Sequence, residues 1–174
     1  MPHRSQANVT TIKESAKDFL KVLDAYRNPP KTERGLDIAL FAYFFARFSN
    51  VTRQFNVIMP QSQAPHRIDF RFGGTNPILL EFALRPRSGG GHLLAPNNKS
   101  ELRKLSRIPP SRARVRVLLV IDLRKRVEPL DRLKRNYENF HLGRGNFPRH
   151  GVRVVYVHPQ QTETFFWVPY RAQA

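Results

Sequence analysis

The chain has 174 residues, of which 40% are hydrophobic, and it carries 30 Lys plus Arg against 13 Asp plus Glu, a formal net charge of +17. This length fits one domain with a full hydrophobic core and excludes two large ones. The chain contains no cysteine, which excludes disulfides, thiolate zinc sites and cysteine nucleophiles. Catalysis would therefore have to use carboxylates, histidines and water.

The positive charge indicates a polyanionic partner. Most of the cations are arginines, whose planar guanidinium groups bind phosphate through paired hydrogen bonds. No segment reaches the ~18 apolar residues of a membrane span, and residues 1–30 carry Lys and Asp, unlike a secretory signal. We therefore expect no membrane association, a cytoplasmic, intracellular location, and nucleic acid as the partner, with DNA favoured over RNA.

Two helices are predicted in the first part of the chain. Residues 11–26 begin with a capping box of Thr11 and Glu14 and carry one apolar stripe. Residues 32–48 form the second helix, whose second half has aromatic side chains nearly all round. Such a helix is buried on several sides or lies partly in a dimer interface, so a homodimer is possible.

The rest of the chain alternates strand-like and helical patterns. Strands are predicted at residues 54–59, 67–72, 78–84, 115–123, 152–158 and 162–168, and helices at 99–108 and 130–140. The run 115–123 is almost continuously apolar, which is typical of a central strand covered on both faces. We predict an α/β fold with a mixed central β-sheet flanked by helices, in a single domain covering 1–174. The Gly- and Ser-containing segment 85–98 is predicted to be a mobile basic loop.

The segment 67–84 predicts a hairpin with two acids facing each other. A pairing centred on Thr75 matches apolar residues with apolar ones: Phe72 with Ile78, Phe70 with Leu80, and Ile68 with Phe82. The same register places Asp69 opposite Glu81, with Cβ atoms about 4.5 to 5.5 Å apart. Two like charges there repel unless a cation lies between them, and either a divalent metal ion or an arginine could supply that charge.

The sequence allows two explanations for this acid pair, a metal site or a ladder of ion pairs. Oxygen-rich carboxylate sites suit Mg²⁺ or Mn²⁺, which could activate water beside a phosphodiester. Alternatively, Arg67, Arg71 and Arg85 could pair with the two acids in an ordinary charged ladder. Two other acids have simple structural explanations: Asp37 would complement the dipole of the second helix, and Asp122 would form a salt bridge at the end of its strand.

The order of elements over residues 32–123 resembles that of the PD-(D/E)XK nucleases: a helix with an acid, a strand, a hairpin with Asp and then Glu, a helix and a buried strand. The resemblance implies a restriction-endonuclease-like core. It also implies that Glu33, Asp69 and Glu81 are the catalytic acids, and that Asp69 and Glu81 bind Mg²⁺ or Mn²⁺. In the family's (D/E)-X-K tripeptide, however, this chain has Ala83 at the lysine position.

Another cation would have to replace that lysine if the site is active. Arg67 lies opposite Ala83 in the predicted register, and Arg85 is two residues further along the same strand face. An arginine can stabilise an anion but cannot act as a base. Lys99, at the start of the next helix, could transfer protons as well, and it completes the predicted catalytic set of Glu33, Asp69, Glu81 and Lys99.

A cationic surface is predicted around this site. The alternation of Arg112, Arg114 and Arg116 would direct three guanidinium groups to one side of a strand. The predicted nucleic-acid contacts are Arg67, Arg85, Arg87, Lys99, Arg103, Lys104, Arg107, Arg112, Arg114 and Arg116. Two functions follow: a Mg²⁺-dependent endonuclease that hydrolyses phosphodiester bonds, or a catalytically degenerate binding module or subunit of a nucleic-acid-processing complex.

Overall fold

The computed structural model describes residues 4–26, 30, 32–58, 65–87, 93–142 and 150–169, and within them six strands form one mixed sheet. The strands are β1 (Val51–Val57), β2 (His66–Phe72), β3 (Ile78–Arg85), β4 (Val115–Asp122), β5 (Val152–His158) and β6 (Gln161–Trp167). Their order in space is their order in the chain. β1, β2 and β3 are antiparallel neighbours, β3, β4 and β5 run parallel, and β6 is antiparallel to β5. The predicted mixed α/β fold is confirmed.

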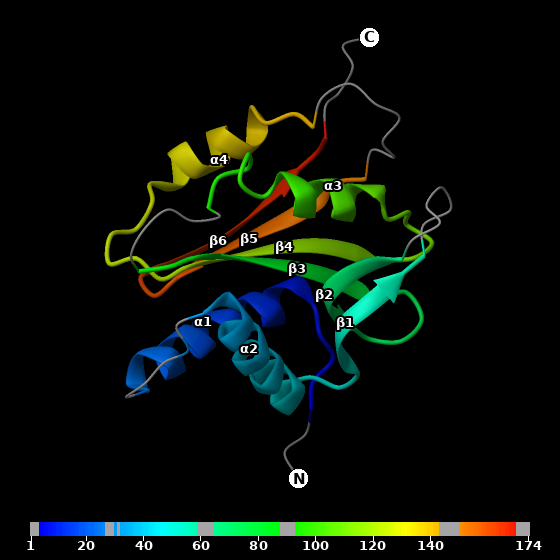
Figure 1. The fold of residues 1–174 in the computed structure, drawn as a ribbon, viewed down its shortest axis with the longest axis horizontal. Coiled ribbons are helices and arrows are strands. Elements are labelled where there is room, and N and C mark those ends of the chain that lie inside the picture. Colours follow the sequence, from blue (N-terminus) through cyan, green and yellow to red (C-terminus); the bar gives the residue numbers. More distant parts are fainter. Residues whose placement is uncertain are drawn as a thin grey trace.

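Helices cover both faces of this sheet (Figure 1). α1 (Val9–Ala25) and α2 (Glu33–Arg47) lie on one face, and α3 (Lys99–Arg107) and α4 (Leu130–Glu138) lie on the other. This arrangement is required because the central strands are apolar on both sides. None of the described helices is long and apolar enough to cross a membrane.

The first helix begins earlier than predicted because a different residue caps it. Asn8 Oδ1 accepts a hydrogen bond from Thr11 N at 2.9 Å, and Thr11 Oγ1 accepts one from Asn8 N at 2.9 Å. The predicted capping box of Thr11 and Glu14 is therefore wrong, since Thr11 is its closing member. The predicted start of the second helix is confirmed, because Thr32 Oγ1 accepts from Gly35 N at 3.1 Å.

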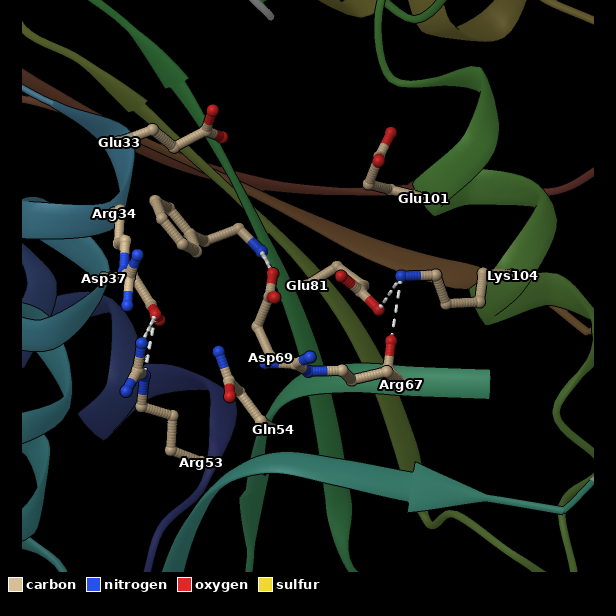
Figure 2. Close-up of a pocket in the computed structure, with 11 residues that line it drawn as sticks. Glu33, Arg34, Asp37, Arg53, Gln54, Arg67, Asp69, Glu81, Glu101 and Lys104 are labelled. Atoms are coloured by element: carbon tan, nitrogen blue, oxygen red, sulfur yellow. Dashed lines mark hydrogen bonds and ion pairs between the residues drawn. The ribbon is translucent and has the colours of Figure 1, made fainter. Parts of the chain in front are cut away.

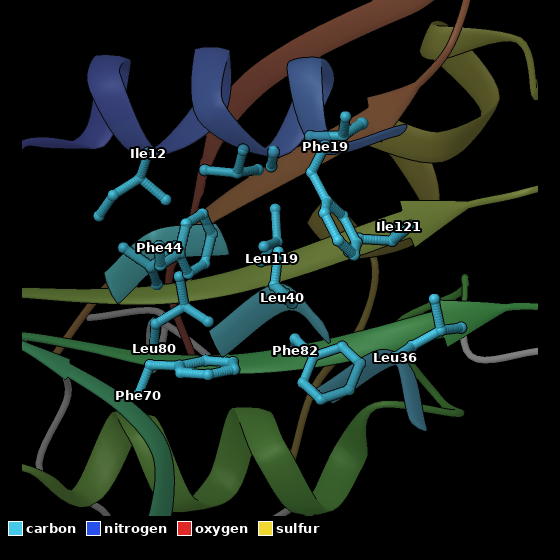
Figure 3. Close-up of a cluster of buried hydrophobic side chains, with 14 of the residues drawn as sticks. Ile12, Phe19, Leu36, Leu40, Phe44, Phe70, Leu80, Phe82, Leu119 and Ile121 are labelled. Carbon is cyan, nitrogen blue, oxygen red and sulfur yellow. The ribbon is translucent and has the colours of Figure 1, made fainter. Parts of the chain in front are cut away.

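Two hydrophobic cores hold the layers together. Figure 3 shows the core on the α1 and α2 side, where Phe44 of α2 lies close to Phe70 of β2 in an edge-to-face contact. β4 contributes Leu119 to this core and Leu118 to the core beneath α3 and α4, which confirms that it is a central strand. α2 is not buried all round, since Phe45 is 45% exposed, and the homodimer stays a prediction.

The β2–β3 hairpin follows the predicted register only in its first half. The observed pairs are Phe72 with Ile78, Arg71 with Leu79, and Phe70 with Leu80. The ladder then ends, and the predicted pair of Ile68 with Phe82 is wrong because these two side chains pack in opposite cores. Asp69 Oδ2 instead accepts a hydrogen bond from Phe82 N at 3.0 Å. A side chain has thus replaced a backbone partner, and β2 separates from β3 at this point.

A change of face in the β1–β2 pair accompanies this separation. In a regular strand, residues two apart point to the same face, yet Phe70 packs towards α2 and Ile68 packs towards α3. The ladder passes from the Arg53–Phe70 pair to the Phe55–Ile68 pair, so Gln54 lies between them with a φ of 56°. The left-handed backbone conformation of Gln54 reverses which face of the sheet the side chains point to. The reversal occurs opposite Asp69, which is not paired in the ladder.

The predicted loop at 85–98 is only partly described, because residues 88–92 lie outside the described residues. Arg85 belongs to β3. Residues 93–98 form packed turns, in which Ala95 N donates to Asn136 Oδ1 at 2.8 Å and Tyr137 Oη donates to Leu93 O at 2.9 Å. Leu93 and Ala95 are buried, and the mobility of the segment stays a prediction.

Candidate active site

A pocket of about 490 Å³ lies where β2 separates from β3. Figure 2 shows α2 on one side of it and α3 on the other, with strands β1, β2 and β3 between them. We call it the acid pocket; its lining residues are Glu33, Arg34, Asp37, Arg53, Gln54, Arg67, Asp69, Glu81, Phe82, Glu101 and Lys104. The three predicted catalytic acids all line it. Five of the 13 acidic residues of this strongly cationic chain line the pocket.

Lys104 of α3 makes the closest charged contact with the predicted metal ligands. Its Nζ lies 2.6 Å from Glu81 Oε1 and donates to Arg67 O at 3.0 Å. The Glu81 side chain is 2% exposed and the Lys104 side chain is 24% exposed, so the ion pair is shielded from bulk water. Lys104 therefore connects β2 to β3 across the opening between them.

The predicted catalytic role of Lys99 is not supported by its position, since Lys99 is exposed and does not line the acid pocket. At ~100° per residue, the five residues from Lys99 to Lys104 turn the side chain about 140° around the helix. The face of α3 that carries Glu101 and Lys104 lines the pocket. Sequence reasoning had assigned Lys104 only to the nucleic-acid surface, whereas the structure places it beside Glu81.

Glu81 is held in an environment that disfavours its negative charge. Burial and then the neighbouring charge of Asp69 raise its pKa to about 9, and the charge of Lys104 opposes that rise. Burial and Asp69 thus favour the neutral carboxyl group, whereas the Lys104 ammonium 2.6 Å away favours the carboxylate. An additional positive charge in the pocket would allow both Asp69 and Glu81 to be carboxylates at once.

Asp37 and Arg53 form one wall of the acid pocket. Arg53 donates to Asp37 Oδ2 through Nε at 2.7 Å and also through Nη2. Asp37 is 8% exposed, and within the described residues its Oδ1 has no hydrogen-bond partner. Its predicted role as a dipole-complementing acid is thus replaced by a buried ion pair. Glu33, one helical turn earlier, is exposed at the rim of the pocket.

The acid pocket offers few carboxyl groups to a divalent ion. Within the described residues, no group of three or more His, Cys, Asp or Glu side chains is placed to hold a metal ion. Mg²⁺ commonly uses only one or two carboxylates and keeps several waters. Asp69 and Glu81 supply two carboxyl groups that interact with each other in one pocket. These residues fit a hydrated, two-carboxylate site, and not a closed protein cage.

Several predicted nucleic-acid contacts are engaged elsewhere. Arg116 is 8% exposed and donates to Ile108 O at 2.8 Å and to Gly151 O at 3.4 Å, so its predicted surface role is wrong. β4 begins at Val115, so Arg112 and Arg114 precede the strand, and the predicted stripe of Arg112, Arg114 and Arg116 on one strand is wrong. Burial also lowers the pKa of the Arg116 guanidinium, as expected for a structural arginine.

Two further arginines are neutralised by carboxylates. Arg85, with a side chain 15% exposed, lies 3.1 Å from Glu128 Oε2 and 3.8 Å from Asp122 Oδ2. It lies in an internal ion-pair cluster instead of on the predicted binding surface. Arg87 is exposed but pairs with Asp24.

The other predicted cations are accessible to a ligand. Arg67 is exposed and lines the acid pocket, and Lys99, Arg112 and Arg114 are exposed elsewhere. Arg114 also donates to Ala7 O at 3.3 Å. Arg103 and Arg107 on α3 are half-buried.

Sequence reasoning missed the position of Lys104 in the acid pocket beside Glu81 and the pairing of Arg53 with Asp37. One signal for Lys104 was available, since Glu101 and Lys104 are three residues apart on the helix and both border the buried residues of α3. No local signal identifies Arg53, because its partner is on another element. Comparison of the chain with family models, with curated proteins and with solved structures found no match in any of the three.

Proposed function

We propose that the chain is a metal-dependent nuclease of the PD-(D/E)XK type, with the acid pocket as its catalytic centre. In this proposal Asp69 and Glu81 hold Mg²⁺ or Mn²⁺, and Lys104 supplies the charge that the family's motif lysine would supply at Ala83. One observation carries the proposal: Lys104 Nζ lies 2.6 Å from Glu81 Oε1 in the pocket that Asp69 also lines.

The arrangement of elements supports the same proposal. The two acids come from antiparallel strands β2 and β3, β3 is paired in parallel with the buried strand β4, and α2 brings Glu33 to the rim. This is the order of parts that the resemblance to the PD-(D/E)XK family implies for a restriction-endonuclease-like core.

Each side chain has a distinct role in the proposed reaction. Bound there, Mg²⁺ or Mn²⁺ would lower the pKa of a water molecule and offset the charge that builds up on the phosphodiester. Lys104 has three N–H donors, and its contacts with Glu81 and Arg67 leave one to donate to a phosphate oxygen. The Arg53–Asp37 pair fixes the opposite wall of the pocket.

The surroundings of the pocket favour a polyanionic substrate. Arg67 lies at the pocket itself, and Arg103 and Arg107 lie on α3 beside Lys104. The pKa of His66 is lowered, first by partial burial and then by the charges of Arg107 and Lys104. A positive potential at this edge of β2 would attract a phosphate chain in a salt-dependent way.

Nicking of supercoiled plasmid tests the proposal. The parent protein should convert the plasmid to open circles with Mg²⁺ or Mn²⁺ and fail to do so with EDTA. Asp69→Asn and Glu81→Gln should each abolish cleavage, because each removes a proposed ligand while keeping the shape of the side chain. Glu138→Gln removes an exposed acid of α4 and serves as the matched control. Nicking by Asp69→Asn or Glu81→Gln at the parent rate would contradict the proposed site.

The same experiment separates the nuclease from a binding module. A degenerate module would bind nucleic acid with strong salt dependence, bind equally well with EDTA, and cleave nothing with either metal. That outcome would remove the catalytic part of the proposal and leave nucleic-acid binding in place.

A further inference from the structure

A second pocket of about 380 Å³ differs from the acid pocket in its charge. It lies between the end of β1, the β2–β3 turn and the turn after α3. We call it the arginine pocket; its lining residues are Phe55, Asn56, Val57, Ile58, Arg71, Gly74, Asn76, Pro77, Ser111 and Arg112. None of these lining residues is Asp or Glu, whereas five acids line the acid pocket.

Arg71 lies over an aromatic ring in this pocket, and within the described residues no acid pairs with it. Its Cζ is 4.5 Å from the centroid of the Phe55 ring, and its Nη2 donates to Gly74 O. Its Nε has no hydrogen-bond partner within the described residues, and no carboxylate of that part of the chain pairs with it. By contrast, Arg53 and Arg85 are each neutralised by an acid. Within the described residues, Arg71 is therefore a cation that is stacked on an aromatic ring and not neutralised by a carboxylate.

The remaining lining residues suit a ligand that has a flat ring as well as a negative charge. Arg112 is exposed and adds a second cation. Asn56, Asn76 and Ser111 offer hydrogen-bond donors and acceptors, and Ile58 offers an apolar surface that is 70% exposed. Bases stack on aromatic rings and on guanidinium planes, and arginine binds phosphate. A nucleotide combines all of these requirements, and the volume lies in the ~300 to 1,000 Å³ range of small-ligand pockets.

The two pockets are neighbours across one strand pair. Asn56 of β1 lines the arginine pocket, and its partner in the ladder is Arg67 of β2, which lines the acid pocket. A strand with one phosphate in the acid pocket would therefore have its adjacent nucleotides at the arginine pocket. In an intact duplex the faces of the bases are stacked on each other and unavailable to such a pocket.

We propose that the arginine pocket binds an unpaired nucleotide of the strand whose phosphate lies in the acid pocket. The base stacks against Phe55 and Arg71, and its phosphate contacts Arg112. This inference rests on the proposed function for the identity of the ligand as nucleic acid. It assigns the substrate class as single-stranded or branched nucleic acid, in preference to continuous duplex.

Binding measured with EDTA tests this assignment without any cleavage. Fluorescence anisotropy would compare a labelled single-stranded oligonucleotide with a duplex of the same length, for the parent protein and three variants. Phe55→Leu removes the ring, Arg112→Gln removes the exposed cation, and Ser111→Trp fills the pocket without changing the net charge. Arg126→Gln is the matched control, because Arg126 is exposed and follows the opposite end of β4.

Each of the three variants should weaken single-strand binding about tenfold, the loss of roughly one stacked base or phosphate contact, and weaken duplex binding less than about twofold. Arg126→Gln should affect both forms equally and weakly. Equal weakening of both forms by Ser111→Trp, or none, would overturn the proposal. Ser111 and Arg112 are exposed, so their variants test it even if Phe55→Leu fails to fold.

Two additional binding measurements distinguish this proposal from the binding of free nucleotides and from the proposed nuclease activity. AMP that binds the parent and not Ser111→Trp, with single-strand binding unchanged, would assign the pocket to free nucleotides and overturn the strand assignment. Glu138→Gln should bind the single strand as tightly as the parent, since Glu138 is exposed and lines neither pocket. Loss of plasmid nicking alone would contradict only the proposed nuclease, and loss of strand preference alone would contradict only this inference.

Discussion

Glu81 and Asp122 are both buried carboxyl groups next to cations, and they differ in how completely they are satisfied. Asp122 is fully buried at the end of β4, where Oδ2 accepts from Tyr156 Oη at 3.0 Å and Oδ1 accepts from Arg124 N at 3.1 Å. Arg85 lies 3.8 Å away. Burial raises the pKa of Asp122, and the Tyr156 hydrogen bond and the Arg85 charge oppose that rise.

Glu81 has the opposite balance. Its second neighbour is another carboxyl group, that of Asp69, and both side chains line an open pocket. Burial is therefore not what distinguishes these two carboxyl groups. The distinction lies in the partners: Asp122 has a donor for each oxygen, whereas Glu81 has the Lys104 ammonium on Oε1 and a second carboxyl group, that of Asp69, beside it.

The largest expected effect is the loss of stability in Asp122→Ala. It leaves the Tyr156 hydroxyl and Arg124 N without their acceptor and removes one of the two carboxyl groups beside Arg85, so we expect a loss of about 3 to 5 kcal/mol in the free energy of unfolding. Urea denaturation of the parent and the variant measures this loss. Glu81→Gln at pH 7 should not lower the free energy of unfolding, because the parent takes up a proton at Glu81 on folding whereas glutamine is neutral in both states. Equal losses in the two variants would contradict the distinction between the sites.

The second effect concerns the two lysines of α3. Lys104→Met keeps the apolar stem and removes the charge beside Glu81, so plasmid nicking should fall about 100-fold. Lys99→Met removes the same charge from an exposed position outside the acid pocket and should leave the rate within about twofold. Initial nicking rates at saturating Mg²⁺ measure both. A greater loss in Lys99→Met would restore the role that the sequence alone had assigned to Lys99.

The third effect is on the pH dependence of stability. The pKa of Glu81 is higher in the folded protein, about 9, than its ordinary value of 4.5, so the folded state binds this proton more tightly. The resulting stabilisation is fully present below about pH 4.5 and is lost as the pH rises through about 9. Between about pH 5 and pH 9 the parent should lose on the order of 5 kcal/mol relative to Glu81→Gln. A constant difference between the two proteins would show that Glu81 is ionised throughout.

The smallest effect is the response to a divalent ion. Mn²⁺ at about five times its dissociation constant should stabilise the parent by about 1 kcal/mol, which raises the Tm by about 3 °C. Asp69→Asn and Glu81→Gln should show no such increase, whereas Asp122→Asn should keep it if the variant folds. A similar increase in all four proteins would indicate that Mn²⁺ binds elsewhere.

The arrangement of strands was largely predictable because it depends on local patterns. The continuous apolar run of β4 requires cover on both faces, and the apolar matches of Phe70 with Leu80 and Phe72 with Ile78 specify the hairpin register. The register beyond Phe70 was not predictable, because a left-handed Gln54 and the Asp69 hydrogen bond interrupt it. Hydrophobic matching alone cannot reveal a side chain that replaces a backbone partner.

The candidate site was predictable in its acids and not in its cations. Asp69 and Glu81 lie on one hairpin, so their proximity follows from local sequence. Lys104 and Arg53 reach the pocket from separate elements, and their positions depend on how α3 and β1 pack on the sheet. Arg116 shows the reverse case, since its alternation with neighbours indicated a surface role while its guanidinium binds two backbone carbonyls.

Asp69 also acts as a spacer, because its carboxylate occupies the Phe82 N–H where the β2–β3 ladder has ended. Removing that oxygen would let the two strands close up, so Asp69→Ala would narrow the pocket as well as remove a charge. Asp69→Asn keeps an oxygen acceptor and separates the two effects. A cation that drew the carboxylate away from Phe82 would uncover a main-chain donor at the floor of the cavity, in reach of an incoming phosphate oxygen.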